Sequence, residues 1–311
     1  MAQLMETRYA YGEALLDLGR RRPDVVVLDA DLYKSTRTVL FRDAFPERFV
    51  DIGISEADMV STAAGMAATG LIPYCNSFAM FITGIGYMPI RTQIAYPSLS
   101  VKLVGSSSGL TQGPDGASHQ SLEDISLMRG LPNMVVVSPA DDLETRQATW
   151  AIADWPGPVY MRLGRYPVPR LLDEGYRFEI AKAKTVRQGS DVALFATGHM
   201  LWKALEAADL LAGERIEAAV INVSTIKPLD EAVVREAAGH AVLLASVEEH
   251  SIIGGLGSAI AECISGIGHA PPLLRLGVHD QFGESGLADE LLELHRLTGP
   301  RIAEDVRSAL R

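Results

Sequence analysis

The chain has 311 residues, 48% of them hydrophobic and 22% charged, which is the balance of a globular protein with room for two ordinary domains. Asp and Glu number 39 against 28 Lys and Arg, so the formal net charge of −11 leaves no basic footprint for nucleic acid. The two cysteines, Cys75 and Cys263, lie far apart and indicate neither a disulfide framework nor a structural zinc site. No apolar run is long enough for a bilayer and residues 1–8 show no signal-like region, so we expect a cytoplasmic protein.

Strand-forming runs alternate with helical patterns through the first half of the chain. The segment 56–69 has apolar positions three and four apart, and Asp141 and Asp142 stand where the start of a helix favours acidic side chains. Strands that alternate with helices predict a parallel sheet covered on both faces. The expected elements are strand 25–28, helix 56–69, strand 101–104, strand 134–137, helix 141–150 and strand 159–162.

Turn-forming residues, among them Pro167, Pro169 and Gly175, interrupt the alternation between residues 165 and 187. A second alternating series follows, so we predict an α/β fold made of two doubly wound, mostly parallel-sheet domains. The predicted boundaries are 1–167 for the first domain, 168–187 for a linker and 188–311 for the second domain. The second series comprises strand 191–196, helix 199–212, strand 218–223, helix 230–238, strand 241–247, helix 254–265 and strand 273–276.

Polar loops follow several of these strands, and open α/β sheets bind their ligands beyond the carboxyl ends of the strands. The loop from Asp29 to Ser35 offers two acids and a serine to a ligand, yet Asp29 and Asp31 equally suit the end of a strand and the cap of a turn. Glu56 stands in the first turn of an apolar helix, where electrostatics alone also favours a carboxylate. Both interpretations stay open for each of these acids on residue type alone.

The glycine-rich loop 105–120 is unusually long, and loops of this kind tend to carry function. Gly105–Gly109 matches the G-x-S-x-G pattern of α/β-hydrolases, but the next residues, Leu-Thr-Gln-Gly-Pro-Asp-Gly, cannot begin the helix that this motif requires. A hydrolase is therefore disfavoured. The polar groups at the end of the loop suit a hydroxylated substrate; they are Asp115, Ser118, His119 and Gln120.

Two features near the end of the chain favour structural roles. Gly254–Ser258 is not a complete dinucleotide-binding fingerprint and has no acidic residue at the expected distance, so close backbone packing at an interface is the preferred interpretation over phosphate binding. His250 follows a strand as a single histidine, which favours a structural or interfacial role over a functional one.

Taken together and in order, these segments resemble the transketolase family, and more closely the C-terminal half of a split transketolase. The resemblance covers nearly all 311 residues, and the common order and spacing of its motifs make it specific. The segments that carry it are Thr7-Arg8, Ala30-Asp31-Leu32 with Ser35, Gly53–Glu56, Ser77–Phe81, Gly113–Gln120, Arg162–Arg165, Lys227–Asp230 and Val247–His250.

The resemblance implies a pyrimidine-binding domain over residues 1–167 and the third domain of the family over 188–311. The family binds thiamine diphosphate between domains of different subunits, one holding the aminopyrimidine and the other the diphosphate with its metal. This chain lacks the Gly-Asp-Gly sequence of the diphosphate-binding domain. We therefore expect a separate partner subunit that carries the Mg²⁺ ligands, in an α2β2 heterotetramer, and no metal ligands in this chain.

The resemblance also assigns expected roles to individual residues. Glu56 would be the catalytic residue, because its carboxylate would hydrogen-bond the pyrimidine ring nitrogen and favour the tautomer that removes the reactive cofactor proton. Phe78 and Phe81 would stack against the pyrimidine ring. The remaining expected cofactor contacts are Asp31, Leu32 and Ile54.

The expected substrate contacts combine phosphate-binding and hydroxyl-binding groups. Arginine pairs its planar fork with phosphate oxygens, and Asp115 would bind a substrate hydroxyl. Many relatives carry histidine where Ser107 stands, so an atypical, sulfonated or branched sugar becomes a credible substrate. The full set is Arg8, Ser35, Ser107, Asp115, His119 and Arg165.

The resemblance thus implies a transferase subunit that moves a two-carbon ketol unit between phosphorylated sugars. One alternative is the β subunit of a 2-oxo acid dehydrogenase E1, which the phosphate-binding Arg8, Ser35 and Arg165 disfavour, because a 2-oxo acid has no distal phosphate. The other alternative is a non-catalytic regulatory subunit, against which the presence of Glu56 argues.

Overall fold

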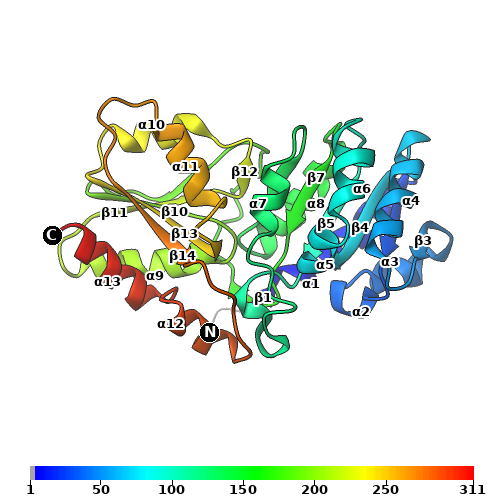
Figure 1. Ribbon diagram of the computed structural model, residues 1–311, viewed down its shortest axis with the longest axis horizontal. Coiled ribbons are helices and arrows are strands. Elements are labelled where there is room, and N and C mark those ends of the chain that lie inside the picture. The colour runs from blue at the N-terminus through cyan, green and yellow to red at the C-terminus, as the bar shows by residue number, and fades with distance from the viewer. Residues whose placement is uncertain (1–3) are drawn as a thin grey trace.

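The computed structural model describes residues 4–311 as two α/β units that lie side by side, with the N-terminal half on the right of Figure 1 and the C-terminal half on the left. The buried strands of both units are runs of β-branched and aliphatic residues, as expected for sheets covered on both faces. The predicted α/β class with mostly parallel sheets is confirmed. No helix in residues 4–311 is both long enough and apolar enough to cross a membrane.

The N-terminal unit is built on a seven-stranded sheet in which only the edge strand β12 pairs antiparallel, with β6. Its central strands, β2, β4 and β5, run parallel and side by side, so their carboxyl ends share one edge. In sheet order the strands are β12 (Thr225–Lys227), β6 (Val135–Val137), β7 (Val159–Arg162), β5 (Lys102–Ser106), β4 (Ile72–Phe78), β2 (Val25–Asp29) and β3 (Phe49–Asp51).

Helices cover both faces of this sheet. On one face α1 packs against α8, and on the other α4, α5 and α7 pack over the strands (Figure 1). Helix α8 begins at the expected place because the carboxylate of Asp141 caps it, accepting the N–H of Glu144 at 2.9 Å. The helices are α1 (Thr7–Arg21), α2 (Tyr33–Thr36), α3 (Val39–Ala44), α4 (Glu56–Ala68), α5 (Ala79–Gly84), α6 (Tyr87–Pro89), α7 (Asp124–Arg129) and α8 (Asp142–Asp154), with short 3₁₀ segments at Pro46–Arg48 and Leu110–Asp115 and a π-helical turn at Ile90–Ala95.

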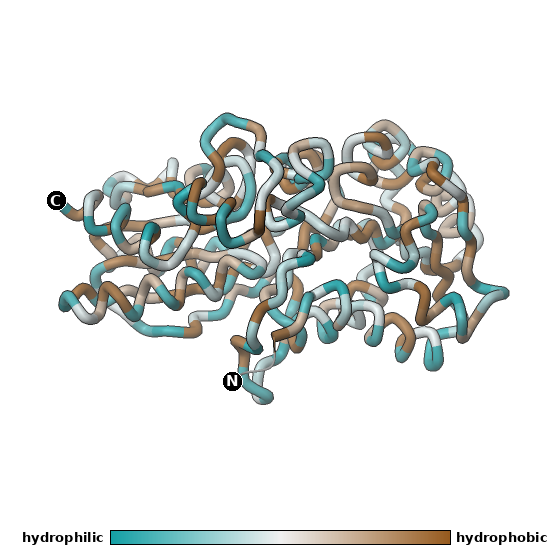
Figure 2. Tube along the Cα trace, turned by 90° about the horizontal axis from the view of Figure 1, so that it is seen from below, coloured by the Kyte–Doolittle hydropathy of each residue, from teal (hydrophilic) through white to brown (hydrophobic). Residues whose placement is uncertain are grey.

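The C-terminal unit has a five-stranded sheet with α9 and α13 on one face and α10 and α11 on the other (Figure 1). Its strands in order are β14 (Leu273–Val278), β13 (Leu243–Ser251), β10 (Val192–Ala196), β11 (Ala218–Asn222) and β9 (Lys184–Arg187), of which β9 pairs antiparallel. Its helices are α9 (Met200–Ala212), α10 (Glu231–Ala238), α11 (Leu256–Ile264), α12 (Ala288–Leu294) and α13 (Gly299–Ala309). On the face seen in Figure 2, apolar and polar residues alternate along the helical turns, as in amphipathic helices.

The two units are joined by more than the connecting chain. Strand β12 comes from the second half of the sequence but completes the sheet of the first half. A two-stranded ribbon pairs β1 (Leu4–Glu6) with β8 (Pro167–Pro169), so the start of α1 is tied to the end of the first unit. One continuous hydrophobic cluster includes residues of α1 and α8 together with residues of α9 and α13. The second unit therefore has a fixed position over the loops of the first.

Candidate functional site

The predicted catalytic carboxylate lies buried beside the central strands of the N-terminal sheet. Glu56 is the first residue of α4 and only 2% of its surface is exposed. The hydroxyl of Ser77, near the end of β4, donates a 2.7 Å hydrogen bond to its Oε1. The other carboxylate oxygen accepts no hydrogen bond from residues 4–311, so it is free to bind a ligand donor.

An aromatic group lies immediately after Ser77. The rings of Phe78 and Phe81 are stacked, with centroids 5.9 Å apart and planes 25° from parallel. The imidazole of His119, from the glycine-rich loop, packs edge-on against both rings at centroid distances of 6.1 and 5.1 Å. The structure thus brings together three of the predicted site residues, from β4, α5 and the loop 105–120, and it places them next to the serine that binds Glu56.

The two acids that follow β2 have different environments. Asp29 is fully buried and accepts hydrogen bonds from the Leu32 amide and the hydroxyls of Thr36 and Thr38. Burial raises the pKa of this carboxyl to about 6, against the lowering effect of the threonine hydrogen bonds. Asp29 therefore holds its own loop together, which is the structural alternative that the sequence left open.

The other predicted cofactor contacts of this region lie at the surface of the chain. Asp31 is exposed and has a left-handed backbone, with φ 59°. Its amide is held by the carboxylate of Asp51, which also accepts the amide of Gly53. Ile54 is 86% exposed, whereas Leu32 is partly buried. Asp51 thus fastens the loop after β2 to the loop that leads into Glu56.

Ser107 lies where the glycine-rich loop leaves β5. It is completely buried and has a left-handed backbone, with φ 54°. Its hydroxyl and that of Ser106 have no hydrogen-bond partner among the residues the structure describes. Buried hydroxyls without partners are uncommon, and the loop has further buried polar atoms without partners, on Thr111, Gln112 and Gln120.

The remaining predicted substrate contacts come together in two pairs. The Arg8 guanidinium donates to the backbone carbonyl of Ser35 at 3.0 Å. The Arg165 guanidinium lies 3.6 Å from the carboxylate of Asp115, with both side chains nearly half exposed. Thr7 bonds through its hydroxyl to the amide of Gly164 at 2.9 Å. Thr7 directly precedes Arg8 and Gly164 directly precedes Arg165, so this hydrogen bond holds the backbones of the two arginines close together.

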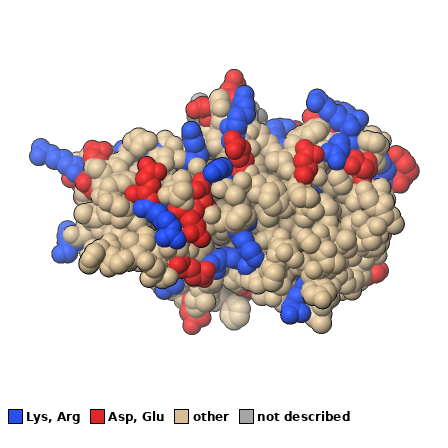
Figure 3. Space-filling view, turned by 90° about the horizontal axis from the view of Figure 1, so that it is seen from above, with Lys and Arg blue, Asp and Glu red and all other residues tan. Residues whose placement is uncertain are grey.

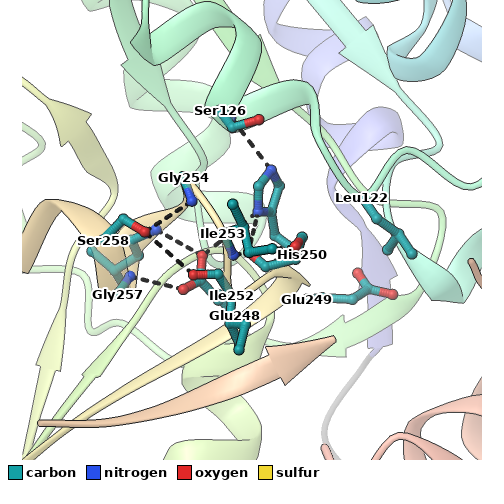
Figure 4. Close-up of polar contacts among 12 residues, drawn as sticks. Leu122, Ser126, Glu248, Glu249, His250, Ile252, Ile253, Gly254, Gly257 and Ser258 are labelled. Carbon is teal, nitrogen blue, oxygen red and sulfur yellow. Dashed lines mark hydrogen bonds and ion pairs between the residues drawn. The ribbon is translucent and has the colours of Figure 1, made fainter. Parts of the chain in front are cut away.

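The motif Val247–His250 on β13 joins the two units (Figure 4). The carboxylate of Glu248 accepts the amides of Leu256 and Gly257 at 2.7 and 2.8 Å and so caps the start of α11. Burial raises the pKa of this carboxyl to about 7, although these two hydrogen bonds lower it. Glu248 is therefore a structural group of the C-terminal unit.

His250 faces the N-terminal unit from the same strand. Its Nδ1 lies 2.7 Å from the carbonyl oxygen of Ser251, and its Nε2 lies 3.4 Å from the amide of Ser126 in α7. A carbonyl only accepts, so Nδ1 carries the proton and Nε2 accepts, and burial lowers the pKa of this imidazole to about 4. A Cβ added at Gly254 would lie 2.5 Å from the Cβ of Ser126. Both features serve the interface, as their sequence context favoured.

Three other residues near the site, Ser77, Glu249 and His199, were assigned no role from the sequence. Ser77 was only part of a motif, since a serine in a strand has no distinctive pattern. Glu249 and His199 form a buried pair with Oε2 and Nε2 3.3 Å apart. They are 50 residues apart in the chain and become neighbours only through the packing of the second unit, so no local pattern could reveal them.

Comparison with known proteins identifies the family. Residues 3–169 match the model of the transketolase pyrimidine-binding domain, and residues 181–302 match that of the transketolase C-terminal domain. The chain belongs to the transketolase family, and it corresponds to the C-terminal section of a split transketolase. Members of this transferase family depend on thiamine diphosphate.

Several relatives are separate subunits of similar length. The chain is 44% identical to a Methanocaldococcus jannaschii protein provisionally named a transketolase C-terminal section, over 98% of this chain and 96% of that one. It is 42% identical to a 6-deoxy-6-sulfo-D-fructose transketolase subunit of Clostridium sp., over 95% and 91%. A solved structure described as a split-gene transketolase, an inactive β4 tetramer, superposes with a TM-score of 0.91 at 44% identity and 98% coverage of both chains.

Proposed function

We propose that this chain is the C-terminal subunit of a thiamine-diphosphate-dependent transketolase that transfers a two-carbon ketol unit between phosphorylated sugars. The observation that carries the proposal is Glu56, a buried carboxylate oriented by Ser77, with the stacked rings of Phe78 and Phe81 next along the chain. A pyrimidine ring needs both a flat apolar neighbour and a carboxylate beside its ring nitrogen. The residues present fit that group.

Each of these residues has a defined task in the proposed site. When bound, thiamine diphosphate supplies the nucleophilic carbon that accepts the ketol unit. Glu56 would hydrogen-bond the pyrimidine nitrogen through its free oxygen, while Ser77 fixes the orientation of the carboxylate. Phe78 and Phe81 would hold the ring plane, and His119, which contacts both rings, would line the approach of the substrate. Asp31, Leu32 and Ile54 complete the proposed cofactor surface at the partner subunit.

The substrate end of the site would be polar and cationic. Arg8 and Ser35 already contact each other, as do Arg165 and Asp115, and these two pairs suit a sugar phosphate with free hydroxyls. Ser107 replaces the histidine that many family members use for the substrate phosphate. Together with the likeness to a sulfofructose transketolase subunit, this difference favours an atypical phosphorylated, sulfonated or branched sugar as one of the two substrates.

The proposed enzyme needs a partner subunit with the diphosphate-binding domain and the Mg²⁺ ligands, in an α2β2 assembly. Large apolar side chains stand exposed on the N-terminal unit, which has a broad area without charged side chains in Figure 3. Surfaces of this kind usually mark protein interfaces. The most exposed of these side chains are Ile54, Ile85, Met88 and Tyr96.

A reconstitution assay tests the proposed activity. This chain is assayed for ketol transfer from xylulose 5-phosphate, alone and mixed with a candidate diphosphate-binding subunit, with thiamine diphosphate and Mg²⁺ present. Activity in the mixture only is the expected result. A stable complex that binds the cofactor but transfers nothing from any sugar phosphate tested would contradict the proposal.

The role of Glu56 is tested in the same assembled complex. Glu56→Gln keeps the size of the side chain but removes the carboxylate, so we expect turnover to fall by at least about 100-fold, within the range for a lost acid–base group. Asp58→Asn is the matched control, because Asp58 is an exposed carboxylate in the same first turn of α4. Full activity of the Glu56→Gln complex would leave the non-catalytic alternative standing.

A further inference from the structure

Glu249 is a buried carboxylate of the C-terminal unit that reaches into the glycine-rich loop of the N-terminal unit. On β13 it points away from its neighbour Glu248, as successive side chains of a strand do (Figure 4). Its Oε1 accepts the amide of Thr111, and its carboxylate lies so close to Gly109 that any Cβ there would overlap it. Gly109 also has φ +78°, which favours glycine. The loop 105–120 thus has a fixed point on the other unit.

The second oxygen of Glu249 faces His199, which precedes α9. Its Oε2 lies 3.3 Å from the Nε2 of His199 without hydrogen-bond geometry, and neither atom has a hydrogen-bond partner among residues 4–311. The imidazole packs against the ring of Tyr166, with centroids 5.4 Å apart. A Cβ added at Gly164 would contact its Nδ1 at 3.6 Å. The pair therefore touches a second loop of the N-terminal unit, residues 163–166.

Each of these two loops carries expected substrate contacts. The loop 105–120 holds Ser107, Asp115 and His119, and the loop 163–166 holds Arg165. The hydroxyl of Thr7 binds Gly164, which adds the segment with Arg8 to the same junction. Glu249 and His199 of the C-terminal unit thus contact the two loops that carry most of the proposed substrate contacts.

Burial makes the protonation of Glu249 sensitive to pH near neutrality. Burial raises the pKa of the Glu249 carboxyl to about 7, while the charge of Arg162 and the Thr111 hydrogen bonds lower it. Burial, together with Arg162 and Lys203, lowers the pKa of His199 to about 3, so the imidazole is neutral. The titratable and charged groups that face the pair are Arg162 of β7, Asp124 of α7, Tyr166 and Lys203 of α9.

We propose that Glu249, acting through Thr111 and His199, is a positioning residue that holds the two substrate loops of the N-terminal unit in place. The C-terminal unit then contributes to substrate binding without touching the substrate. The part that concerns substrate rests on the proposed function, whereas the anchoring of the loops does not. A positioning residue of this kind affects the KM for the sugar and leaves cofactor binding at Glu56 unchanged.

The anchoring is tested first by hydrogen exchange of the full chain. Glu249→Ala removes the acceptor for Thr111, so we expect exchange in 109–120 and 163–166 to become about tenfold faster, as for the loss of one buried hydrogen bond. Glu249→Gln retains an amide oxygen for Thr111 and should restore the slow exchange at pH 6. Burial raises the pKa of Glu249 to about 7 in the closed loop, so ionisation favours the opened loop; the wild-type loop should lose protection as the pH rises toward 7, and the Gln variant should not.

The contribution to substrate binding is then measured in the assembled complex. We expect Glu249→Ala to raise the KM for the sugar about tenfold, with less than a threefold change in kcat and an unchanged affinity for thiamine diphosphate. Glu249→Gln should restore the KM at pH 6. Glu248→Gln is the matched control, because Glu248 is an equally buried acid on the same strand that touches α11 instead of the loops. It should leave the KM and the loop exchange unchanged.

The outcomes separate the two proposals. If the wild-type complex shows no ketol transfer, the proposed function fails, while hydrogen exchange still decides the anchoring. If Glu249→Ala does not fold, the comparison of wild type and Glu249→Gln across pH 6 to 8 decides it. Unchanged loop exchange in Glu249→Ala, identical pH dependence of protection in wild type and Glu249→Gln, or an equal effect of Glu248→Gln on the loops would overturn the positioning role.

Discussion

Three buried acids of this chain have the same side-chain chemistry but different partners, and the partners decide what each acid can do. Both carboxylate oxygens of Asp29 accept hydrogen bonds from the turn that follows β2. Both carboxylate oxygens of Glu248 accept hydrogen bonds from the amides at the start of α11. Glu56 receives a single serine hydroxyl and keeps one oxygen for a ligand. Acids that are saturated by their own fold stabilise it, whereas an acid with spare acceptor capacity is available for chemistry.

These differences explain which site residues could be predicted from the sequence. The acids, aromatics and arginines of the N-terminal half stand in motifs whose order is distinctive, so they were available without a structure. Whether Asp29 binds a ligand or a turn depends on Thr36 and Thr38, whose hydroxyls reach it only after folding. The partnership of Glu249 with Thr111 spans 138 residues and has no local signature at all.

The pH dependence of stability tests the burial of Glu248. Its carboxyl has a pKa of about 7 in the folded chain against an ordinary value of 4.5 when unfolded, so the folded state binds the proton more tightly. The stability from this group is complete below pH 4.5 and is lost as the pH rises to about 7, on the order of 3 kcal/mol in all. Glu248→Gln removes this loss.

Urea unfolding of wild type and Glu248→Gln at several pH values between about 5 and 8 measures the effect. Glutamine cannot accept both helix amides, so the variant is expected to be less stable at low pH. The gap in the free energy of unfolding should narrow as the pH rises and stay constant above about pH 7. A gap that is the same at every pH would show that Glu248 does not titrate in this range.

At the level of elements, hydrophobic periodicity was sufficient for the regular parts of both sheets. Strand β7 and helix α4 lie where they were expected, to within a residue. Strand β12 was not predicted, because its three residues, Thr-Ile-Lys, are too few to show a hydrophobic period and its partner β6 belongs to the other half of the chain. Strand β4 was not predicted either, because Pro73 and Asn76 interrupt its apolar pattern.

The contact between α7 and the turn before α11 gives a prediction at this scale. Gly254 has φ +80° and an added Cβ would lie 2.5 Å from that of Ser126, so Gly254→Ala forces either backbone strain or separation of the two elements. We expect the free energy of unfolding to fall by about 3 kcal/mol. Thermal or urea unfolding measures this.

The control for this substitution lies at the other end of the same helix. Gly266 follows α11 and meets nothing within 4 Å of an added Cβ, so Gly266→Ala should change the free energy of unfolding by less than about 1 kcal/mol. If both alanine variants unfold alike, the close approach at Gly254 does not hold the two units together.

At the scale of the whole molecule, the two units share more than a sequence boundary would suggest. Strand β12 belongs to the second half of the chain but pairs with β6 of the first half. The side-chain amide of Asn222 in the second half donates a 2.9 Å hydrogen bond to the buried carboxylate of Glu144 in the first half. The buried guanidinium of Arg162 donates to the carbonyl of Glu249 at 2.8 Å. Buried polar groups of the first unit therefore depend on the second for their partners.

Separating the two halves tests this dependence. A fragment of residues 1–187 keeps six strands of the first sheet but loses β12, which leaves the edge of β6 unpaired and the buried charge of Arg162 without the Glu249 carbonyl. We expect the fragment to be at least about 5 kcal/mol less stable than the full chain, at roughly 1 kcal/mol for each lost hydrogen bond and more for the buried charge. Urea unfolding of the fragment, alone and coexpressed with residues 188–311, measures the difference.

Coexpression should recover a soluble complex, because the interface is rebuilt from the same groups. A fragment that unfolds at the same urea concentration as the full chain would show that the first unit is self-sufficient, and that β12 only lies along its edge.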